Sequence, residues 1–239
     1  RLPYVIAGRG ADAAVGFIAG VMGGLGGYSG VLPAVWTQLR GWSKTEARAF
    51  YQPFIVAVHV ATIAALGTVA PFLHLDTAHL ERMLAVNVRA PLLLARALAP
   101  LLRRTQGAIV NIASISAVRS TPLHAYGPMK AAIVGLTENL AGEWGRSGVR
   151  VNCLSPGAVL TPAMQTSFDQ GLRDRATMAQ ASATGHICLP REVAQAAAFL
   201  LSDEAAAITG VNLPVDHGWL VATSWQTFGG LRAAVSSPT

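Results

Sequence analysis

Residues 107–157 read GAIVNIASISAVRSTPLHAYGPMKAAIVGLTENLAGEWGRSGVRVNCLSPG, and their pattern decides the fold class. Residues 107–113 form a short, continuous apolar run of the kind found in buried parallel strands. Residues 126–144 have the length and composition of a helix that ends at glycines. Residues 149–154 form the next apolar strand. Strand, helix and strand in this order predict a βαβ unit and a parallel sheet.

The segments on either side continue this alternation. Residues 76–104 are predicted to form a long helix capped by Thr77, residues 190–201 a helix with proline in its first turn, and residues 208–215 a last strand. Residues 162–187 are predicted to be irregular and to act as a mobile lid. We therefore expect an α/β fold, a Rossmann-like doubly wound parallel sheet with flanking helices.

Composition excludes several classes of protein. The chain has 239 residues, of which 52% are hydrophobic and 13% charged, so it can bury a sizeable core and is not a disordered chain. The net charge of +6 is spread without a run of five like charges, so no nucleic-acid partner is predicted. With only Cys153 and Cys188 present, neither a disulfide framework nor a metal site at His186 and Cys188 is predicted.

The first 75 residues have a different texture. Residues 13–39 and residues 49–75 are two runs of 27 residues without Asp, Glu, Lys or Arg, separated by a short basic loop that contains Trp42. Runs of this length are typical of membrane-spanning segments, and membrane association through residues 13–75 as an apolar helical hairpin is one interpretation. The seven glycines of the first run are tolerated in membrane helices but weaken helices in water, and a proline breaks each run. Buried core segments of a soluble domain give the same pattern, so a degenerate first βα unit is the other interpretation.

Residues from about 15 to 67 resemble a fragment of the sulfite exporter TauE/SafE family of membrane permeases. The resemblance rests on the glycine-rich apolar segment followed by LRGWSK (39–44), Arg48 and QPF (52–54). It implies a piece of a permease and not a whole transporter, because no second copy of the pattern follows.

Tyr126 and Lys130 carry the chemistry that the residues themselves indicate. Four positions apart on a helix, their side chains share one face, although this pattern alone is also typical of a solvated helix face. A phenol has an ordinary pKa near 10, and a nearby ammonium lowers that pKa toward useful acid–base chemistry. Ser114 follows the strand at 107–113, at the edge where parallel sheets bind ligands, so Ser114 and Tyr126 are expected to reach one carbonyl oxygen. Asn87 is expected to anchor a water molecule or the Lys130 side chain.

Six stretches together resemble the short-chain dehydrogenase/reductase family, in the order and near the spacing of that family. They are LAVNVRAPLLLARALAP (84–100), GAIVNIASISA (107–117), AYGPMKAAIVGLTENLAGEW (125–144), VRVNCLSPGAVLTP (149–162), PREVAQAAAFLLSDEAAAITG (190–210) and VDHGW (215–219). The resemblance implies hydride transfer between NAD or NADP and a small-molecule alcohol or ketone. It also implies a cytoplasmic location and a homo-oligomer, a dimer or a tetramer.

The same resemblance implies a role for each matching residue. Tyr126 would exchange a proton with the substrate oxygen, which Ser114 would hold. Lys130 would lower the pKa of Tyr126 and bind the ribose hydroxyls, and Asn87 would complete a proton relay. The nicotinamide end of the cofactor would meet Pro156, Gly157, Val159 and Thr161. No metal is implied, and His217 follows Asp216 where the family usually has glycine.

The front of the chain departs from the family pattern. Gly20, Gly24 and Gly26 have the spacing of a pyrophosphate-binding turn, but Ala19 stands where threonine is usual. The family's Asn-Asn-Ala-Gly motif is absent, and the 61 positions from Gly26 to Asn87 are about one βαβ unit short. The residue that would distinguish NAD from NADP is therefore not identified.

These observations lead us to interpret the chain as a chimera that begins, at Arg1, as a fragment or processed product. Residues 1–71 would be the permease-like segment, residues 72–224 the catalytic part and residues 225–239 a loose tail. Two functions stay open. One is an NAD(P)-dependent oxidoreductase impaired by a missing cofactor-binding front half, and the other is a membrane permease-derived fragment or a non-catalytic chimera.

Overall fold

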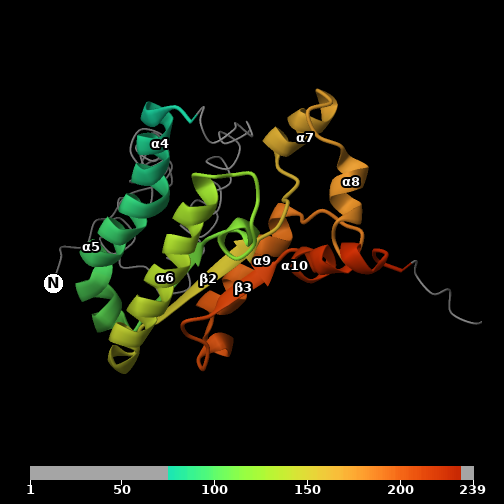
Figure 1. Ribbon diagram of the computed structural model, residues 1–239. Helices are drawn as coiled ribbons and strands as arrows, with labels where there is room; N and C mark the ends of the chain where they lie inside the picture. The colour runs from blue at the N-terminus through green and yellow to red at the C-terminus, as the bar shows by residue number, and fades with distance from the viewer. Residues whose placement is uncertain (1–74, 233–239) are drawn as a thin grey trace, which may run out of the picture.

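The computed structural model describes residues 75–232, which form a three-stranded parallel sheet with helices packed around it (Figure 1). The strand order is β1-β2-β3, with β1 at Ala108–Ile112, β2 at Arg150–Pro156 and β3 at Asn212–Val215. The register pairs Ile112 with Leu154 and Leu154 with Leu213. The predicted parallel α/β sheet is confirmed for these residues.

The last strand begins later than predicted, at Asn212 instead of residue 208. Buried Asn152 on β2 accounts for this difference. Its Nδ2 donates to the carbonyl of Ile208 at 2.8 Å, and its Oδ1 accepts from the backbone N–H of Val211 at 3.1 Å. These side-chain bonds stand beside two backbone bonds over the same approach, from the N–H of Gly210 to the carbonyl of Val151 and from the N–H of Cys153 to the carbonyl of Val211, so the pairing before β3 is irregular.

Two helices have the predicted bounds and cover opposite faces of the sheet. On one face, Ala113 and Cys153 pack against Ile133 of α6 (Tyr126–Trp144). On the other face, Ile112 and Leu154 belong to one apolar cluster with side chains of α9 (Pro190–Leu201). Side chains alternate between faces along a strand, so apolar runs such as 107–113 and 149–154 supply both layers of core. The described part is therefore doubly wound.

The predicted helix over 76–104 is confirmed as one continuous rod made of α4 (Thr77–Leu84), a π-helical turn at Ala85–Arg89 and α5 (Ala90–Thr105). The predicted cap was wrong. Asp76 caps the rod, since its carboxylate accepts the backbone N–H groups of Ala78 at 3.3 Å and His79 at 2.9 Å. A carboxylate has two acceptor oxygens and a charge that suits a helix N-terminus, which Thr77 lacks.

The π-helical turn has a cause in the sequence. Pro91 has no N–H to donate to the carbonyl four residues earlier, that of Asn87, and its ring crowds that carbonyl. The backbone widens instead, and the Ala90 N–H bonds to the carbonyl of Ala85, five residues back. Asn87 therefore sits in a distorted turn, a setting that recurs at functional sites.

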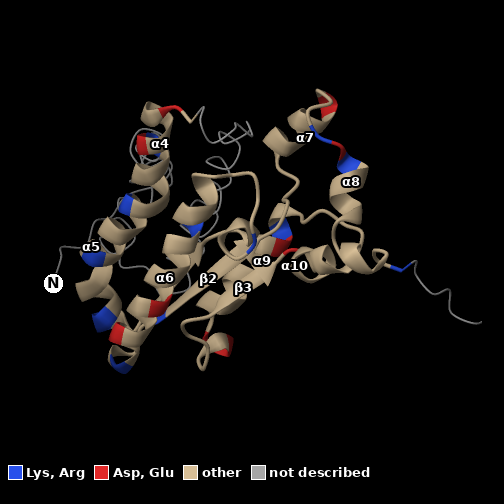
Figure 2. Cartoon of the chain, viewed as in Figure 1, with Lys and Arg blue, Asp and Glu red and all other residues tan. Residues whose placement is uncertain are grey.

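Among the described residues, one helix (Thr77–Thr105, 29 residues) is long and apolar enough to cross a membrane. The core helix of a soluble protein meets the same criterion, so this finding alone assigns no membrane role. Figure 2 shows acidic residues at the α4 end of the rod and basic residues along its whole length, with both kinds near α7 and α8. The permease-like segment and the uncharged runs up to residue 74 lie outside the described residues.

Residues 162–187 were predicted to be irregular, and this prediction was wrong. They contain α7 (Pro162–Asp169) and α8 (Arg175–Gln180), which extend away from the sheet in Figure 1. Thr161 and Asp174 cap them, each accepting a backbone N–H. Helices of one or two turns are too short to show a clear hydrophobic period in a sequence.

The remaining described elements are short. They are α10 (Trp219–Ala222) and 3₁₀ turns at Ile115–Ala117, Gly145–Ser147, Asp203–Ala205 and Thr223–Phe228. The predicted loose tail is thus helical in its first part, and residues 233–239 lie outside the described residues.

Gly127, the second residue of α6, allows the turn after β1 to pack against the start of the helix. A Cβ at Gly127 would lie 3.0 Å from the carbonyl oxygen of Ser116, whereas one at Gly135 on the same helix would meet nothing within 4 Å. We expect Gly127→Ala to be less stable than Gly135→Ala by about 1–3 kcal/mol, because alanine favours both helical positions but overpacks only the first. Urea unfolding of both variants measures the difference, and equal stabilisation would contradict the packing described.

Candidate active site

Ser114 lies at the carboxyl end of β1, where its side chain begins a 3₁₀ turn. The backbone N–H of Ala113 donates to the carbonyl of Leu154 at 2.7 Å, so the ends of β1 and β2 are held at one edge of the sheet. Ser114 Oγ accepts the N–H of Ser116 at 3.2 Å and caps the turn Ile115–Ala117. The hydroxyl hydrogen remains available to a second partner.

Tyr126 is the first residue of α6, and its ring is buried against Met83 of α4 and Met129. This contact joins the α4–α5 rod to the start of α6. Burial raises the pKa of the Tyr126 hydroxyl above its ordinary value of 10.0, while the neighbouring side chain of Ser114 acts in the opposite direction. In this structure the phenol is neutral at physiological pH.

Lys130 is buried one turn later, with its ammonium at the carboxyl end of β1. Its Nζ donates to the backbone carbonyl of Ile112 at 2.9 Å and lies 5.3 Å from the ring centroid of Tyr126. Burial lowers the pKa of Lys130 from 10.5 to about 8, and the Cys153 thiol acts weakly the other way. The predicted solvated helix face does not occur here, because this side chain is only 1% exposed.

Asn87 is also buried, in the π-helical turn that contacts α6. Its Nδ2 donates to the carbonyl of Met83 at 3.0 Å, and its Oδ1 accepts no hydrogen bond from Lys130, so the expected contact between these two side chains is not formed. The other end of the amide, Oδ1, is directed elsewhere and is free to accept a hydrogen bond.

Two atoms of this group are buried without a hydrogen-bond partner in the described part of the chain, Tyr126 Oη and Asn87 Oδ1. The Ser114 side chain is close enough to lower the pKa of Tyr126, but the two hydroxyl groups do not form a full hydrogen bond. Buried polar atoms in native proteins are nearly always paired, so each orphaned atom calls for an explanation. A ligand with an oxygen atom would satisfy the phenol hydroxyl.

Pro156 and Gly157 lie at the same edge, at the end of β2. The N–H of Gly157 donates to the carbonyl of Val215 at 2.9 Å, and a Cβ at Gly157 would lie 3.0 Å from Cα of Asp216. The close approach of the chain after β3 therefore requires glycine at 157.

Val159 and Thr161 continue from this turn into α7. Val159 forms a parallel bridge with Cys188, in which the N–H of Leu160 donates to the carbonyl of Cys188 at 2.7 Å and the Cys188 N–H to the carbonyl of Ala158 at 2.9 Å. Thr161 Oγ1 accepts the N–H of Met164 at 3.2 Å. The hydroxyl expected to meet a cofactor is thus also a helix cap.

The structure brings Ser114, Tyr126 and Lys130 together, places Asn87 against the same helix, and sets Pro156 and Gly157 on the neighbouring strand. The predicted pyrophosphate glycines, Gly20, Gly24 and Gly26, lie outside the described residues.

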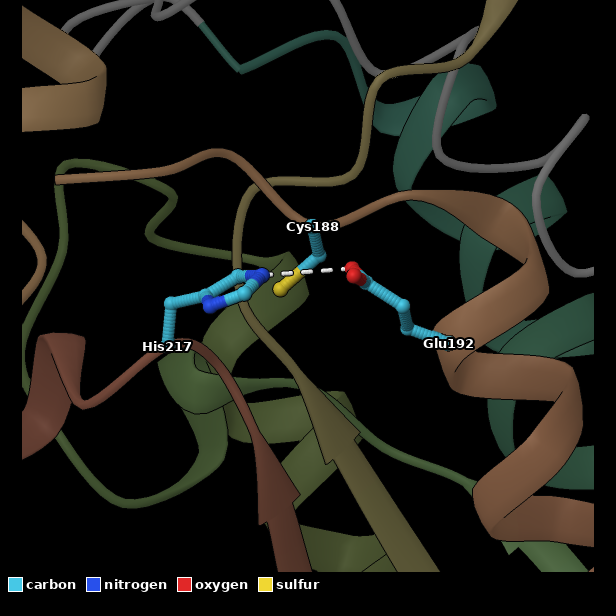
Figure 3. A group of neighbouring side chains, drawn as sticks. All are labelled: Cys188, Glu192 and His217. Atoms are coloured by element: carbon cyan, nitrogen blue, oxygen red, sulfur yellow. Dashed lines mark hydrogen bonds and ion pairs between the residues drawn. The ribbon is translucent and has the colours of Figure 1, made fainter. Parts of the chain in front are cut away.

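One polar cluster was not predicted from the sequence. Figure 3 shows Cys188, Glu192 and His217 directed toward one another, with His217 Nε2 3.2 Å from Glu192 Oε2. The unusual histidine after Asp216 was the available signal, but its partners come from two other parts of the chain.

Comparison with known proteins places this arrangement in a family. A family model described as enoyl-(acyl carrier protein) reductase, of the short-chain dehydrogenase/reductase family, matches residues 44–220. Momilactone A synthase from Oryza sativa subsp. japonica is 43% identical over 162 residues, covering 64% of this chain and 57% of that protein. The match to the family begins inside the segment that we described as permease-like.

Two solved structures are similar to the described fold. A structure described as ribose-5-phosphate isomerase from Brucella melitensis 16M has 46% identity and a TM-score of 0.66, covering 69% of this chain and 64% of that one. A 4-hydroxyisoleucine dehydrogenase mutant complexed with NADH and succinate has 32% identity and a TM-score of 0.59, covering 64% of each chain.

The chain spans less than two thirds of the length of these relatives. The family model nevertheless matches more than half of the chain, over residues 44–220. The chain belongs to the short-chain dehydrogenase/reductase family.

Proposed function

We propose that the chain is an NAD(P)-dependent oxidoreductase that acts on a small-molecule alcohol or ketone. The observation that carries this proposal is the buried group of Ser114, Tyr126 and Lys130 at the edge of a parallel sheet, with the Tyr126 hydroxyl unpartnered among the described residues. A dehydrogenase of similar structure is complexed with NADH, which supports the choice of cofactor.

Tyr126 is the proton donor of the proposed reaction. Because burial raises its pKa, the phenol holds its proton at neutral pH and can give it to a carbonyl oxygen as that oxygen becomes negative. Ser114 donates a second hydrogen bond to the same oxygen and orients it. The protonated phenol suits the reduction of a carbonyl, in which the oxygen must receive a proton.

Lys130 stabilises the tyrosinate that forms. Its ammonium lies 5.3 Å from the Tyr126 ring in a buried setting, where the attraction between opposite charges is stronger than in water. Asn87 Oδ1, which has no partner among the described residues, accepts a hydrogen bond from a water molecule. This water molecule returns a proton to the site.

The residues at this edge fit a nicotinamide cofactor, which would supply the hydride. Pro156, Gly157, Val159 and Thr161 would meet the nicotinamide end, and Lys130 would hold the ribose hydroxyls. Gly20, Gly24 and Gly26 would hold the pyrophosphate. Since the front of the chain departs from the family pattern, we infer that cofactor binding is weaker than in relatives with the full pattern.

We propose residues 72–224 as the catalytic part, preceded by the atypical segment 1–71 and followed by the tail 225–239. We further propose a homo-oligomer in the cytoplasm, where NAD(P) is found. The other interpretation, a membrane permease-derived fragment or a non-catalytic chimera, depends on residues 13–75. If that interpretation is right, the chain needs detergent for extraction and does not bind the cofactor. If the oxidoreductase proposal is right, the chain is extracted without detergent and binds the cofactor.

We expect NADH or NADPH to quench or enhance the fluorescence of the full chain in a saturable titration. Tyr126→Phe should retain this binding and lower carbonyl reduction about 10²–10⁴-fold, because it removes only the transferable proton. Lys130→Ala should weaken the binding itself. Oxidation of the nicotinamide with a panel of ketones measures turnover and also excludes a redox-neutral isomerase. Absence of binding to soluble, folded chain would overturn the proposal.

Two serines of the same turn provide a matched comparison. Ser114→Ala should lower ketone reduction by about 10²–10³-fold, since it removes a donor to the developing oxyanion. Ser116→Ala should leave it unchanged, because only the backbone of Ser116 takes part in the packing described here. The initial rate of NAD(P)H oxidation decides between them, and equal losses in both variants would contradict the assigned role.

Lys130 also predicts how stability depends on pH in the cofactor-free chain. Its pKa is about 8 when folded against 10.5 as the ordinary value, so between these pH values the unfolded state binds more protons and stability rises with pH. Across this interval, the contribution of Lys130 to the free energy of unfolding rises by about 3 kcal/mol. Between pH 7 and pH 10, urea unfolding should show the wild type gaining stability relative to Lys130→Met. The buried thiols of Cys153 and Cys188, whose pKa values are raised to about 11, lower the stability of both proteins over this range. The same pH dependence in both proteins would contradict it.

A further inference from the structure

Cys188, Glu192 and His217 form a cluster separate from the group around Tyr126. Cys188 precedes α9, Glu192 lies in the first turn of α9, and His217 follows β3, so three segments meet here (Figure 3). One ligand atom from each side chain lies within 4.8 Å of the other two. The Cys188 side chain is buried, whereas the side chain of His217 is 24% exposed and that of Glu192 is 31% exposed. The cluster can therefore be reached from solvent.

We propose that Cys188 Sγ, Glu192 Oε2 and His217 Nε2 bind a thiophilic divalent cation, Zn²⁺ in preference to Mg²⁺ or Ca²⁺. Thiolate and imidazole select zinc over the hard cations, which require oxygen ligands. Three protein ligands leave a fourth position for water on the exposed side. On binding, the thiol proton passes to solvent and the sulfur binds as thiolate.

The distances are close to what zinc requires. Zn–N and Zn–O bonds of about 2.1 Å in a tetrahedron place N and O about 3.4 Å apart, and a Zn–S bond of about 2.3 Å places S about 3.6 Å from either. The observed separation of His217 Nε2 and Glu192 Oε2 is 3.2 Å. The sulfur lies within 4.8 Å of both, so a shift of at most about 1 Å brings it to the metal, exchanging its contact with the carbonyl of Val215 for the cation.

The surroundings orient the ligands as metal sites usually do. Thr184 Oγ1 lies 2.9 Å from His217 Nδ1, which fixes the ring and directs Nε2 into the cluster. His217 holds a left-handed backbone with φ of 53°, one of two non-glycine residues to do so in the described chain. Glu192 Oε2 also accepts the N–H of Leu189 at 2.7 Å, so the carboxylate cannot turn away.

Charge in the cluster favours a cation. The negative charges of Glu192 and Asp216 lie close enough to the Cys188 sulfur to raise the pKa of its thiol, in addition to the larger effect of burial. The positive charge nearby, on Arg191, is exposed to solvent. Asp216 is not a ligand, because its two carboxylate oxygens accept the N–H groups of Gly218 and Leu220 at 2.9 and 2.8 Å. Glu192 therefore provides the anionic oxygen.

Titration of the full chain with Co²⁺ tests the site, because cobalt bound to thiolate absorbs in the near ultraviolet and tetrahedral cobalt absorbs in the visible. We expect one equivalent to give both bands and Zn²⁺ to remove them. The thiolate band should be lost in Cys188→Ala and retained in Cys153→Ala, the matched variant at the other buried cysteine. His217→Ala should weaken binding at least 100-fold and Thr184→Val about 10–100-fold.

Glu192→Gln keeps an oxygen for the N–H of Leu189, so it separates loss of the ligand from loss of the helix cap. It should fold as the wild type does by circular dichroism and bind Co²⁺ more weakly. The proposal is overturned if folded wild type gives no thiolate band, or if the band persists in Cys188→Ala. It is also overturned if Cys153→Ala loses the band while remaining folded. None of these outcomes depends on cofactor binding or turnover.

Discussion

The burial of one ammonium group organises the edge of the sheet where the proposed chemistry takes place. Lys130 cannot be hydrated in its position, so its Nζ needs a fixed acceptor, and the carbonyl of Ile112 at the end of β1 supplies it at 2.9 Å. That hydrogen bond ties α6 to the strand one turn after Tyr126. It therefore positions the phenol relative to Ser114, which follows the same strand. Burying the charged side chain of Lys130 is costly for a protein whose role is only structural. The burial is explained if the charge acts on Tyr126.

Local signals were sufficient for the long elements and for the order of the fold. The bounds of α6 and α9 agree with the prediction, because each helix shows several turns of apolar pattern and α9 begins at Pro190. The predictions failed where one side chain decides locally. Asp76 and not Thr77 caps the first helix, and the Asn152 side chain binds the backbone of the segment before β3. Such choices depend on tertiary contacts that periodicity does not contain.

In the candidate active site, too, some features could be predicted from the sequence and others depend on tertiary contacts. The positions of Ser114 and Tyr126 followed from strand and helix ends, so their proximity could be predicted. Their electrostatics could not, because the pKa of Tyr126 depends on how deeply the ring is buried against Met83 of another helix. The sequence pattern alone predicted that Lys130 would lower the pKa of Tyr126, whereas burial raises it in this structure. The cost of desolvation is a property of the packed core and is not visible in residue spacing.

The proposed zinc cluster and the proposed cofactor edge are parts of one structural unit. Cys188 exchanges two backbone hydrogen bonds with the segment at 158–160, and Asp216, beside His217, packs against Gly157. A cation that joins Cys188 to His217 would close a ring of contacts through both segments that follow β2 and β3. The segment that carries Val159 and Thr161 would then be held through its backbone hydrogen bonds to a metal-bound Cys188. Metal binding would thus rigidify the turn that is proposed to meet the nicotinamide.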